Sequence, residues 1–203
     1  MIRRTYVWPL VVVLSLAGAW IAAGVAAPVR AAETPRVGSL APDFSLPDEA
    51  GTLHKLSDYR GKLVVLEWTN PECPYVKRHY GADTMETLSQ EFDTDVVWLA
   101  VNSTKSNSPQ DSQAWKREQG FQYATLQDPA GEVGRLYGAR TTPNMYVIDS
   151  EGMLRYSGAI DDDPRGRSDE PRNYVSGAIR ALLLGAAPDP GETRSYGCSV
   201  KYK

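Results

Sequence analysis

The chain has 203 residues, of which 42% are hydrophobic and 23% are charged, and its formal net charge is −3 at pH 7. This mildly acidic balance argues against a nucleic-acid partner. The sequence also lacks a C-x-x-C-H haem motif, a G-x-x-x-x-G-K-[ST] phosphate loop and the paired Cys and His residues of a zinc site, so it predicts no cofactor and no metal.

The N-terminus predicts export. Arg3 and Arg4 precede a long apolar stretch, residues 7–27, and residues 29–31 (Val-Arg-Ala) fit the end of a cleavable leader. Residues 1–31 are therefore expected to form a signal peptide. An uncleaved membrane anchor is the alternative, because the apolar stretch is longer than most signal peptides have. Either alternative places the rest of the chain in the bacterial periplasm or on the outer face of the cytoplasmic membrane, where disulfides persist.

The remaining chain is long enough for one domain with its own core. We expect this domain at residues 32–186, followed by a tail without periodicity at residues 187–203 that carries Cys198. Cys73 and Cys198 are the two cysteines of the sequence, which is the smallest number that can form a bridge.

The spacing of apolar residues predicts alternating strands and helices. Strands are expected within 37–55 and at 63–66, 96–101, 121–126, 145–148 and 154–158, and helices at 74–92, 108–118, 132–137 and 173–184. Gly81 is expected to kink or divide the first helix. This order predicts an α/β domain with a central mixed sheet, in which a parallel pair is extended by an antiparallel hairpin, and with an N-terminal strand extension.

Cys73 stands directly after a predicted buried strand and before Pro74, which suits the first position of a helix. The free backbone N–H groups and the dipole at a helix start stabilise a thiolate. The sequence therefore favours a reactive Cys73, with a buried and inert cysteine as the alternative. Val76 occupies the place where a C-x-x-C motif has its second thiol, so a partner thiol has to come from elsewhere.

Several segments resemble a known family. The stretches "VGSLAPDFSLPDEAG", "LSDYRGKLVVLEW", "NPECPYVKRHY", "TTPNMYVID" and "GCSVKY" are similar to thioredoxin-fold redoxins of the peroxiredoxin-like, AhpC/TSA-related family. The similarity spans nearly all of residues 37–203. It implies a thioredoxin-like fold, with helices flanking the central sheet, and a thiol-dependent oxidoreductase.

The chain departs from the family's patterns in two places. Peroxiredoxins carry a proline seven positions before the cysteine and a threonine three positions before it, and here these positions hold Leu66 and Asn70. Peroxiredoxins also place an arginine beside the cysteine where thioredoxins have a cis-proline. This chain has Pro143 there, after Thr142, with Arg140 nearby. The sequence thus lies between two mechanisms.

Glu67 favours the thioredoxin side of the resemblance. Thioredoxins hold a buried acid six residues before the nucleophilic cysteine, and Glu67 has this spacing inside a predicted strand. A charged residue in a buried strand is costly unless it is paired or protonated, which often marks a functional group. The alternative is a glutamate at the sheet edge that reaches solvent.

The first functional hypothesis is an exported thiol–disulfide oxidoreductase. In it Cys73 attacks a protein or small-molecule disulfide, and Cys198 resolves the mixed disulfide. The resemblance implies that Pro143 orients this mixed disulfide and that Glu67 moves protons.

The second hypothesis is a peroxiredoxin-type thiol peroxidase. In it a hydroperoxide oxidises Cys73 to a sulfenic acid, while Asn70 and Arg140 polarise the peroxide. Cys198 again acts as the resolving thiol. Both enzymes need a thiol electron donor.

The third hypothesis is a non-enzymatic binding domain in which Cys73 and Cys198 form a structural disulfide.

Trp68 and Tyr75 flank Cys73 and, with Thr142, are candidates for the wall of a substrate groove. The alternative for the two aromatic residues is a place in the core.

Overall fold

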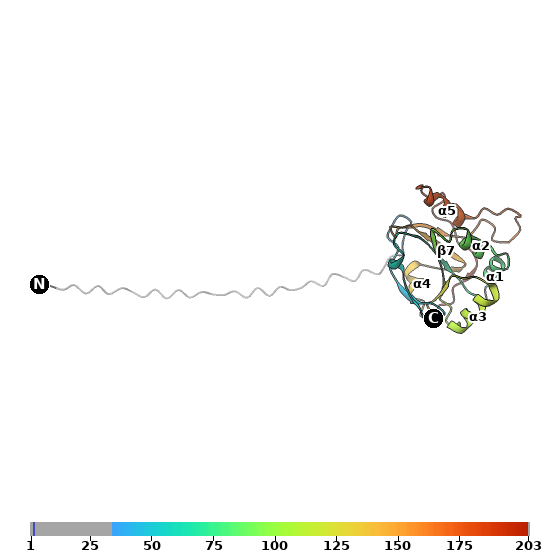
Figure 1. Ribbon diagram of the computed structural model, residues 1–203, viewed down its shortest axis with the longest axis horizontal. Helices are drawn as coiled ribbons and strands as arrows, with labels where there is room; N and C mark the ends of the chain where they lie inside the picture. Colours follow the sequence, from blue (N-terminus) through green and yellow to red (C-terminus); the bar gives the residue numbers. More distant parts are fainter. Residues whose placement is uncertain (1, 3–33, 203) are drawn as a thin grey trace. The chain divides into compact units, whose positions relative to one another are not determined.

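The computed structural model describes residue 2 and residues 34–202 (Figure 1). Apart from Ile2, the expected signal peptide or anchor at residues 1–31 lies outside the described residues. Within the described part of the chain, no helix combines the length and the apolar character needed to cross a membrane.

The strands of the described chain are β1 (Ser45–Pro47), β2 (Leu53–Lys55), β3 (Leu63–Trp68), β4 (Val96–Asn102), β5 (Ala124–Gln127), β6 (Thr141–Thr142), β7 (Asn144–Ile148), β8 (Leu154–Gly158) and β9 (Cys198–Ser199). The helices are η1 (Leu56–Tyr59, a 3-10 helix), α1 (Pro74–Gly81), α2 (Thr84–Glu91), α3 (Pro109–Gln119), α4 (Glu132–Tyr137) and α5 (Tyr174–Leu183). All the strands and helices that the sequence predicts are present, with ends shifted by a few residues. The sequence predicted neither β6 nor β9.

Five strands form the central mixed sheet, in the order β5-β4-β3-β7-β8. Strand β3 pairs in parallel with β4, and β4 with β5, whereas β7 and β8 run antiparallel. The predicted parallel pair and antiparallel hairpin are thus confirmed. All six residues of β3 are buried, as expected for the middle strand of a sheet that is covered on both faces.

The two faces of this sheet carry separate cores. Residues that alternate along a strand point to opposite faces. Val65 accordingly packs with side chains of α1, α2 and α5, and Leu66 and Trp68 pack with side chains of α4. Figure 1 shows how the helices cover the sheet.

The helix that follows Cys73 is divided where the sequence predicts. α1 ends at Gly81, and Asp83 adopts a left-handed conformation (φ 54°) before α2 begins. The break turns the chain while Tyr80 and Met85 both stay in the core beneath it.

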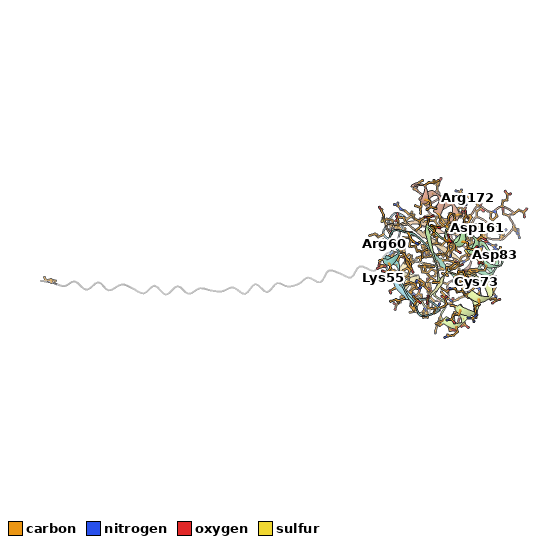
Figure 2. All side chains as sticks on the ribbon, viewed as in Figure 1. Lys55, Arg60, Cys73, Asp83, Asp161 and Arg172 are labelled. Carbon is orange, nitrogen blue, oxygen red and sulfur yellow. The ribbon has the colours of Figure 1, made fainter. Side chains whose placement is uncertain are left out.

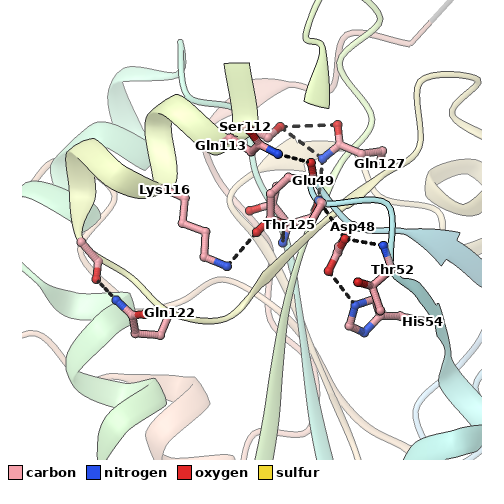
Figure 3. Close-up of polar contacts among 12 residues, drawn as sticks. Asp48, Glu49, Thr52, His54, Ser112, Gln113, Lys116, Gln122, Thr125 and Gln127 are labelled. Atoms are coloured by element: carbon pink, nitrogen blue, oxygen red, sulfur yellow. Dashed lines mark hydrogen bonds and ion pairs between the residues drawn. The ribbon is translucent and has the colours of Figure 1, made fainter. Parts of the chain in front are cut away.

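An N-terminal hairpin, formed by β1 and β2, precedes the sheet. Asp48 closes its turn by accepting hydrogen bonds from the N–H groups of Ala50 and Thr52, both at 2.8 Å. The adjacent Glu49 is buried, pairs with Lys116 of α3 at 2.7 Å and accepts from the N–H of Thr125 in β5 at 2.7 Å (Figure 3). Glu49 therefore fastens the predicted N-terminal extension to the edge of the sheet.

The C-terminal tail is docked onto the domain. Strand β9 pairs antiparallel with β6, with Thr141 opposite Ser199 and Thr142 opposite Cys198. Gly197 has φ +128°, and a Cβ atom built on it would lie 2.0 Å from the carbonyl oxygen of Thr142. Glycine is required here because the backbone approaches so closely. The tail therefore has a fixed place, although its sequence shows no periodicity.

Candidate active site

Cys73 occupies the position just before α1. It is the N-cap residue, with an extended backbone (φ −76°, ψ 122°), and Pro74 follows at the first helical position. Its N–H donates to the carbonyl of Asn70 at 2.9 Å, which closes a turn between β3 and α1. The side chain is 1% exposed and lies among closely packed side chains (Figure 2). The sequence thus placed Cys73 correctly at a helix start.

The structure brings Cys198 to Cys73. The Cys73 thiol donates to the carbonyl oxygen of Thr142 at 3.0 Å. Cys198 is the residue opposite Thr142 in the β6–β9 pair, and it packs against the core cluster that contains Cys73. Both cysteines are free thiols. Two residues from distant parts of the sequence thus form one dithiol site.

The two thiols differ in acidity. Burial raises the pKa of Cys73, but the Thr142 side chain, the N–H of Val76 and Cys198 together outweigh it and hold the pKa below its ordinary value. Burial, the hydrogen bond to Cys73 and the charge of Cys73 raise the pKa of Cys198 to about 11. Cys73 is therefore the more acidic of the two thiols.

Thr142 and Pro143 form the loop that faces Cys73. The peptide bond between them is cis. Thr142 is 1% exposed, and its hydroxyl oxygen has no hydrogen-bond partner of regular geometry among the described residues. A buried hydroxyl without a partner is costly, so this one is available to donate to a thiolate at Cys73.

Glu67 is fully buried on the same sheet face as α1. Its carboxylate accepts from the Tyr80 hydroxyl at 3.0 and 3.2 Å and from Trp98 Nε1 at 3.1 Å. Burial raises its pKa to about 7, and these hydrogen bonds offset only part of that rise. The alternative of an edge glutamate that reaches solvent is wrong, since Glu67 is 0% exposed and lies in the middle strand. A carboxyl group with this pKa exchanges protons near neutral pH.

Trp68 does not line a substrate groove. It is 0% exposed, and strand alternation points it to the opposite sheet face from Glu67. There its Nε1 donates to Ser103 Oγ at 3.1 Å, and its ring packs on Tyr137 with centroids 5.4 Å apart. The expectation of a groove wall is wrong, and the core alternative is confirmed.

Tyr75 lies at the surface beside Cys73. It is 36% exposed, and its ring centroid is 5.9 Å from that of Tyr196 in the tail. Its position is compatible with contact to a substrate that approaches the dithiol.

Asn70 and Arg140 contribute mainly backbone geometry. The Asn70 side-chain oxygen accepts from the N–H of Glu72 at 2.9 Å, within the turn that precedes Cys73. The Arg140 backbone bonds to Asn144 and Val200, while its side chain is exposed. Within residues 34–202, Arg140 makes no hydrogen bond to Cys73, which weakens its expected role in polarising a peroxide.

Sequence reasoning missed the partners of Glu67. Tyr80 lies in a predicted helix and Trp98 in a predicted strand, but no local pattern links either residue to the acid. A buried tyrosine or tryptophan generally finds a hydrogen-bond partner, and that rule is the signal that would have suggested the pairing.

Comparison with known proteins identifies the family. The AhpC/TSA family model matches residues 37–157, which is more than half of the chain. The chain belongs to the AhpC/TSA family. The resemblance inferred from the sequence motifs is therefore confirmed.

The chain is similar to proteins named as both kinds of thiol enzyme. The chain is 30% identical over 126 residues to thiol-disulfide oxidoreductase ResA of Geobacillus thermodenitrificans, covering 59% of this chain and 67% of the relative. It is 32% identical over 109 residues to peroxiredoxin bcp1 of Schizosaccharomyces pombe, covering 52% of this chain and 53% of the relative.

The solved structures agree on the fold. A hypothetical protein, SMc02350 from Sinorhizobium meliloti, superposes with a TM-score of 0.76 at 23% identity, covering 84% of this chain and 97% of that chain. The thioredoxin-like fold expected from the sequence, a mixed sheet flanked by helices, is confirmed.

Proposed function

We propose that this thiol-dependent oxidoreductase exchanges disulfides through Cys73 and Cys198. The observation that carries the proposal is the meeting of two free thiols of unlike acidity in the folded domain. An acidic thiol attacks readily, and a neighbouring thiol provides the exit from the mixed disulfide that forms.

The chemistry balances as a two-electron exchange. The Cys73 thiolate attacks one sulfur of a substrate disulfide, forms a mixed disulfide and releases the first substrate thiolate. Cys198 loses its proton and attacks Cys73, which releases the second substrate thiolate and leaves a Cys73–Cys198 disulfide. The substrate is reduced and the dithiol is oxidised, and an external thiol donor then reduces the pair.

Two residues support these steps. Glu67, with a pKa near neutrality, is proposed to accept and return the protons that the thiols exchange. Pro143 is buried directly after Thr142, whose carbonyl holds the Cys73 thiol, and is proposed to orient the mixed disulfide.

A thiol peroxidase is the second candidate. Membership of the AhpC/TSA family and the similarity to peroxiredoxin bcp1 favour it. Against it, the exposed Arg140 makes no hydrogen bond to Cys73 and is not placed to stabilise a bound peroxide there. We therefore rank disulfide exchange first.

The compartment is part of the proposal. We infer from Arg3, Arg4 and the apolar residues 7–27 that the domain at residues 32–186 and its tail act outside the cytoplasm, after cleavage or while anchored. Cell fractionation and N-terminal sequencing of the native protein test this inference. Recovery of an intact N-terminus in the cytoplasmic fraction contradicts it.

The reaction is tested with two substrates in parallel. We would measure reduction of a dye-labelled glutathione disulfide, with dithiothreitol as donor, and consumption of hydrogen peroxide with the same donor. If the protein exchanges disulfides, wild type turns over the glutathione disulfide and Cys73→Ser does not. In Cys198→Ser disulfide exchange predicts a trapped mixed disulfide on Cys73, detectable by mass spectrometry. Fast peroxide turnover with slow disulfide turnover favours the peroxidase, and inactivity in both assays supports a binding domain.

A further inference from the structure

Tyr196 stands two residues before Cys198 and is held by three side chains from other parts of the fold. Its hydroxyl donates to Asp161 Oδ1 at 2.5 Å, and its oxygen lies 3.0 Å from His79 Nε2 and 3.2 Å from an Arg78 guanidinium nitrogen. A tyrosine has a single hydroxyl proton. The three contacts of Tyr196 are satisfied when that proton goes to Asp161 and the oxygen accepts from Arg78 and from the Nε2–H tautomer of His79; in that tautomer the 3.2 Å approach of Arg78 to His79 Nε2 is not a hydrogen bond.

These four residues, here called the latch cluster (Arg78, His79, Asp161 and Tyr196), join the tail to the helix of the nucleophile. Arg78 and His79 lie in the last turn of α1, the helix that Cys73 begins. His79 is 4% and Asp161 5% exposed, so the hydrogen bonds are largely shielded from water, where bonds to charged groups are stronger. Any movement of the tail at Tyr196 has to break them.

The short segment between Tyr196 and Cys198 transmits this restraint. Gly197 lies against the Thr142 carbonyl so closely that a Cβ atom would be 2.0 Å from its oxygen. With the tail in this place Cys73 is 1% exposed. In this conformation an external disulfide therefore does not reach the Cys73 sulfur.

We propose that Tyr196 is a positioning residue: through the latch cluster it keeps Cys198 over Cys73, and release of the cluster uncovers Cys73 for substrate. This inference rests on the proposed function and adds to it the step by which substrate gains access. A surface cavity of about 620 Å³, bordered by Asp161, Tyr196 and Gly197, lies beside the segment that has to move. While the latch is closed, the high local concentration of Cys198 favours the internal disulfide over a mixed one.

Alkylation of the reduced full chain tests the latch directly. We would treat wild type and Tyr196→Phe with iodoacetamide at pH 7 and follow carbamidomethylation of Cys73 by peptide mass spectrometry. Loss of one hydroxyl is expected to raise the Cys73 rate at least fivefold. The same variant is expected to lower the equilibrium constant for the Cys73–Cys198 disulfide, measured against glutathione, by a similar factor.

Two further comparisons separate the latch from general loosening of the tail. Tyr202→Phe removes a hydroxyl that donates to the Ala139 carbonyl at 2.7 Å, beyond the β6–β9 pair and the bond from Val200 N to Arg140 O. Since those backbone bonds lie between Tyr202 and Cys198, we expect its alkylation rate within twofold of wild type. Asp161→Asn keeps an acceptor for Tyr196 and is expected to be milder than Asp161→Ala.

The outcomes separate this inference from the proposed function. An unchanged alkylation rate and an unchanged glutathione equilibrium in Tyr196→Phe overturn the latch even if the enzyme turns over disulfides. Equal effects of Tyr196→Phe and Tyr202→Phe also overturn it, because the restraint then belongs to the whole tail. Faster alkylation in a protein without disulfide turnover supports the latch and refutes the proposed function alone.

Discussion

Cys198 lies opposite Thr142 in the β6–β9 pair, and the Thr142 carbonyl is the acceptor for the Cys73 thiol. The Thr142 backbone thus positions the two thiols relative to each other. The site needs no C-x-x-C motif, because pairing of two short strands supplies the second thiol that Val76 cannot.

The Thr142 hydroxyl is expected to hold down the pKa of Cys73. Thr142→Val removes the hydroxyl but keeps the shape and the carbonyl, so we expect the pKa of Cys73 to rise. The pH profile of Cys73 alkylation measures the shift. Thr125→Val removes another buried hydroxyl without a regular partner, far from the dithiol, and is the matched control. A profile that moves equally in both variants contradicts the assignment.

Glu67 should make stability depend on pH. Its pKa is about 7 in the folded protein, above the 4.5 of an ordinary glutamate, so the folded state binds the proton more tightly than the unfolded chain. Protonated Glu67 therefore contributes fully to the free energy of unfolding below pH 4.5. This contribution, about 3 kcal/mol, is lost as the pH rises through 7. Urea unfolding at pH 4 and pH 8 measures it.

Glu67→Gln is the comparison for that measurement. Glutamine still accepts a hydrogen bond from Trp98 but does not ionise. We therefore expect the free energy of unfolding of the variant to fall less than that of wild type between pH 4 and pH 8. We also expect slower thiol exchange at pH 7. Equal pH dependence in the two proteins would show that Glu67 keeps an ordinary pKa.

Gly197→Ala should displace the tail without unfolding the domain. The new Cβ would meet the Thr142 carbonyl at 2.0 Å, and φ of +128° disfavours alanine. We expect fast Cys73 alkylation and a poor yield of the Cys73–Cys198 disulfide. Gly185→Ala is the control, because Gly185 also has a positive φ (+72°) but has nothing within 4 Å of the added atom. Similar thiol reactivity in both variants would argue against a tail that covers Cys73.

Trp68→Phe should affect stability and leave the chemistry intact. The change removes the bond to Ser103 and leaves a partly filled space, at a cost of about 2 kcal/mol. Because Trp68 faces away from Cys73, the alkylation rate of Cys73 is expected to stay within twofold of wild type. A large change in the KM for a disulfide substrate would restore Trp68 as a groove residue.

The sequence predicted the sheet well because its strands are apolar runs whose burial depends little on distant contacts. It also marked Cys73 and Glu67, since a cysteine at a helix start and an acid within a buried strand stand out locally. The expectation that Trp68 lines a substrate groove was wrong, because side chains alternate between the two faces along a strand and Trp68 lies on the face opposite to Glu67. The sequence could not show β9, since two residues have no periodicity and their structure comes from pairing with Thr141 and Thr142.

Contacts outside the site occupy both edges of the central sheet. Glu49 occupies the N–H of Thr125 on the β5 edge, while on the β8 edge Ser157 bonds to the backbone of Gly191 and Thr193. An open strand edge invites another polypeptide to add to it, and aggregation follows. These edge amides already have hydrogen-bond partners. The proposed polypeptide substrates can therefore react with the thiols without adding a strand to the sheet edge, which is the first step toward aggregation.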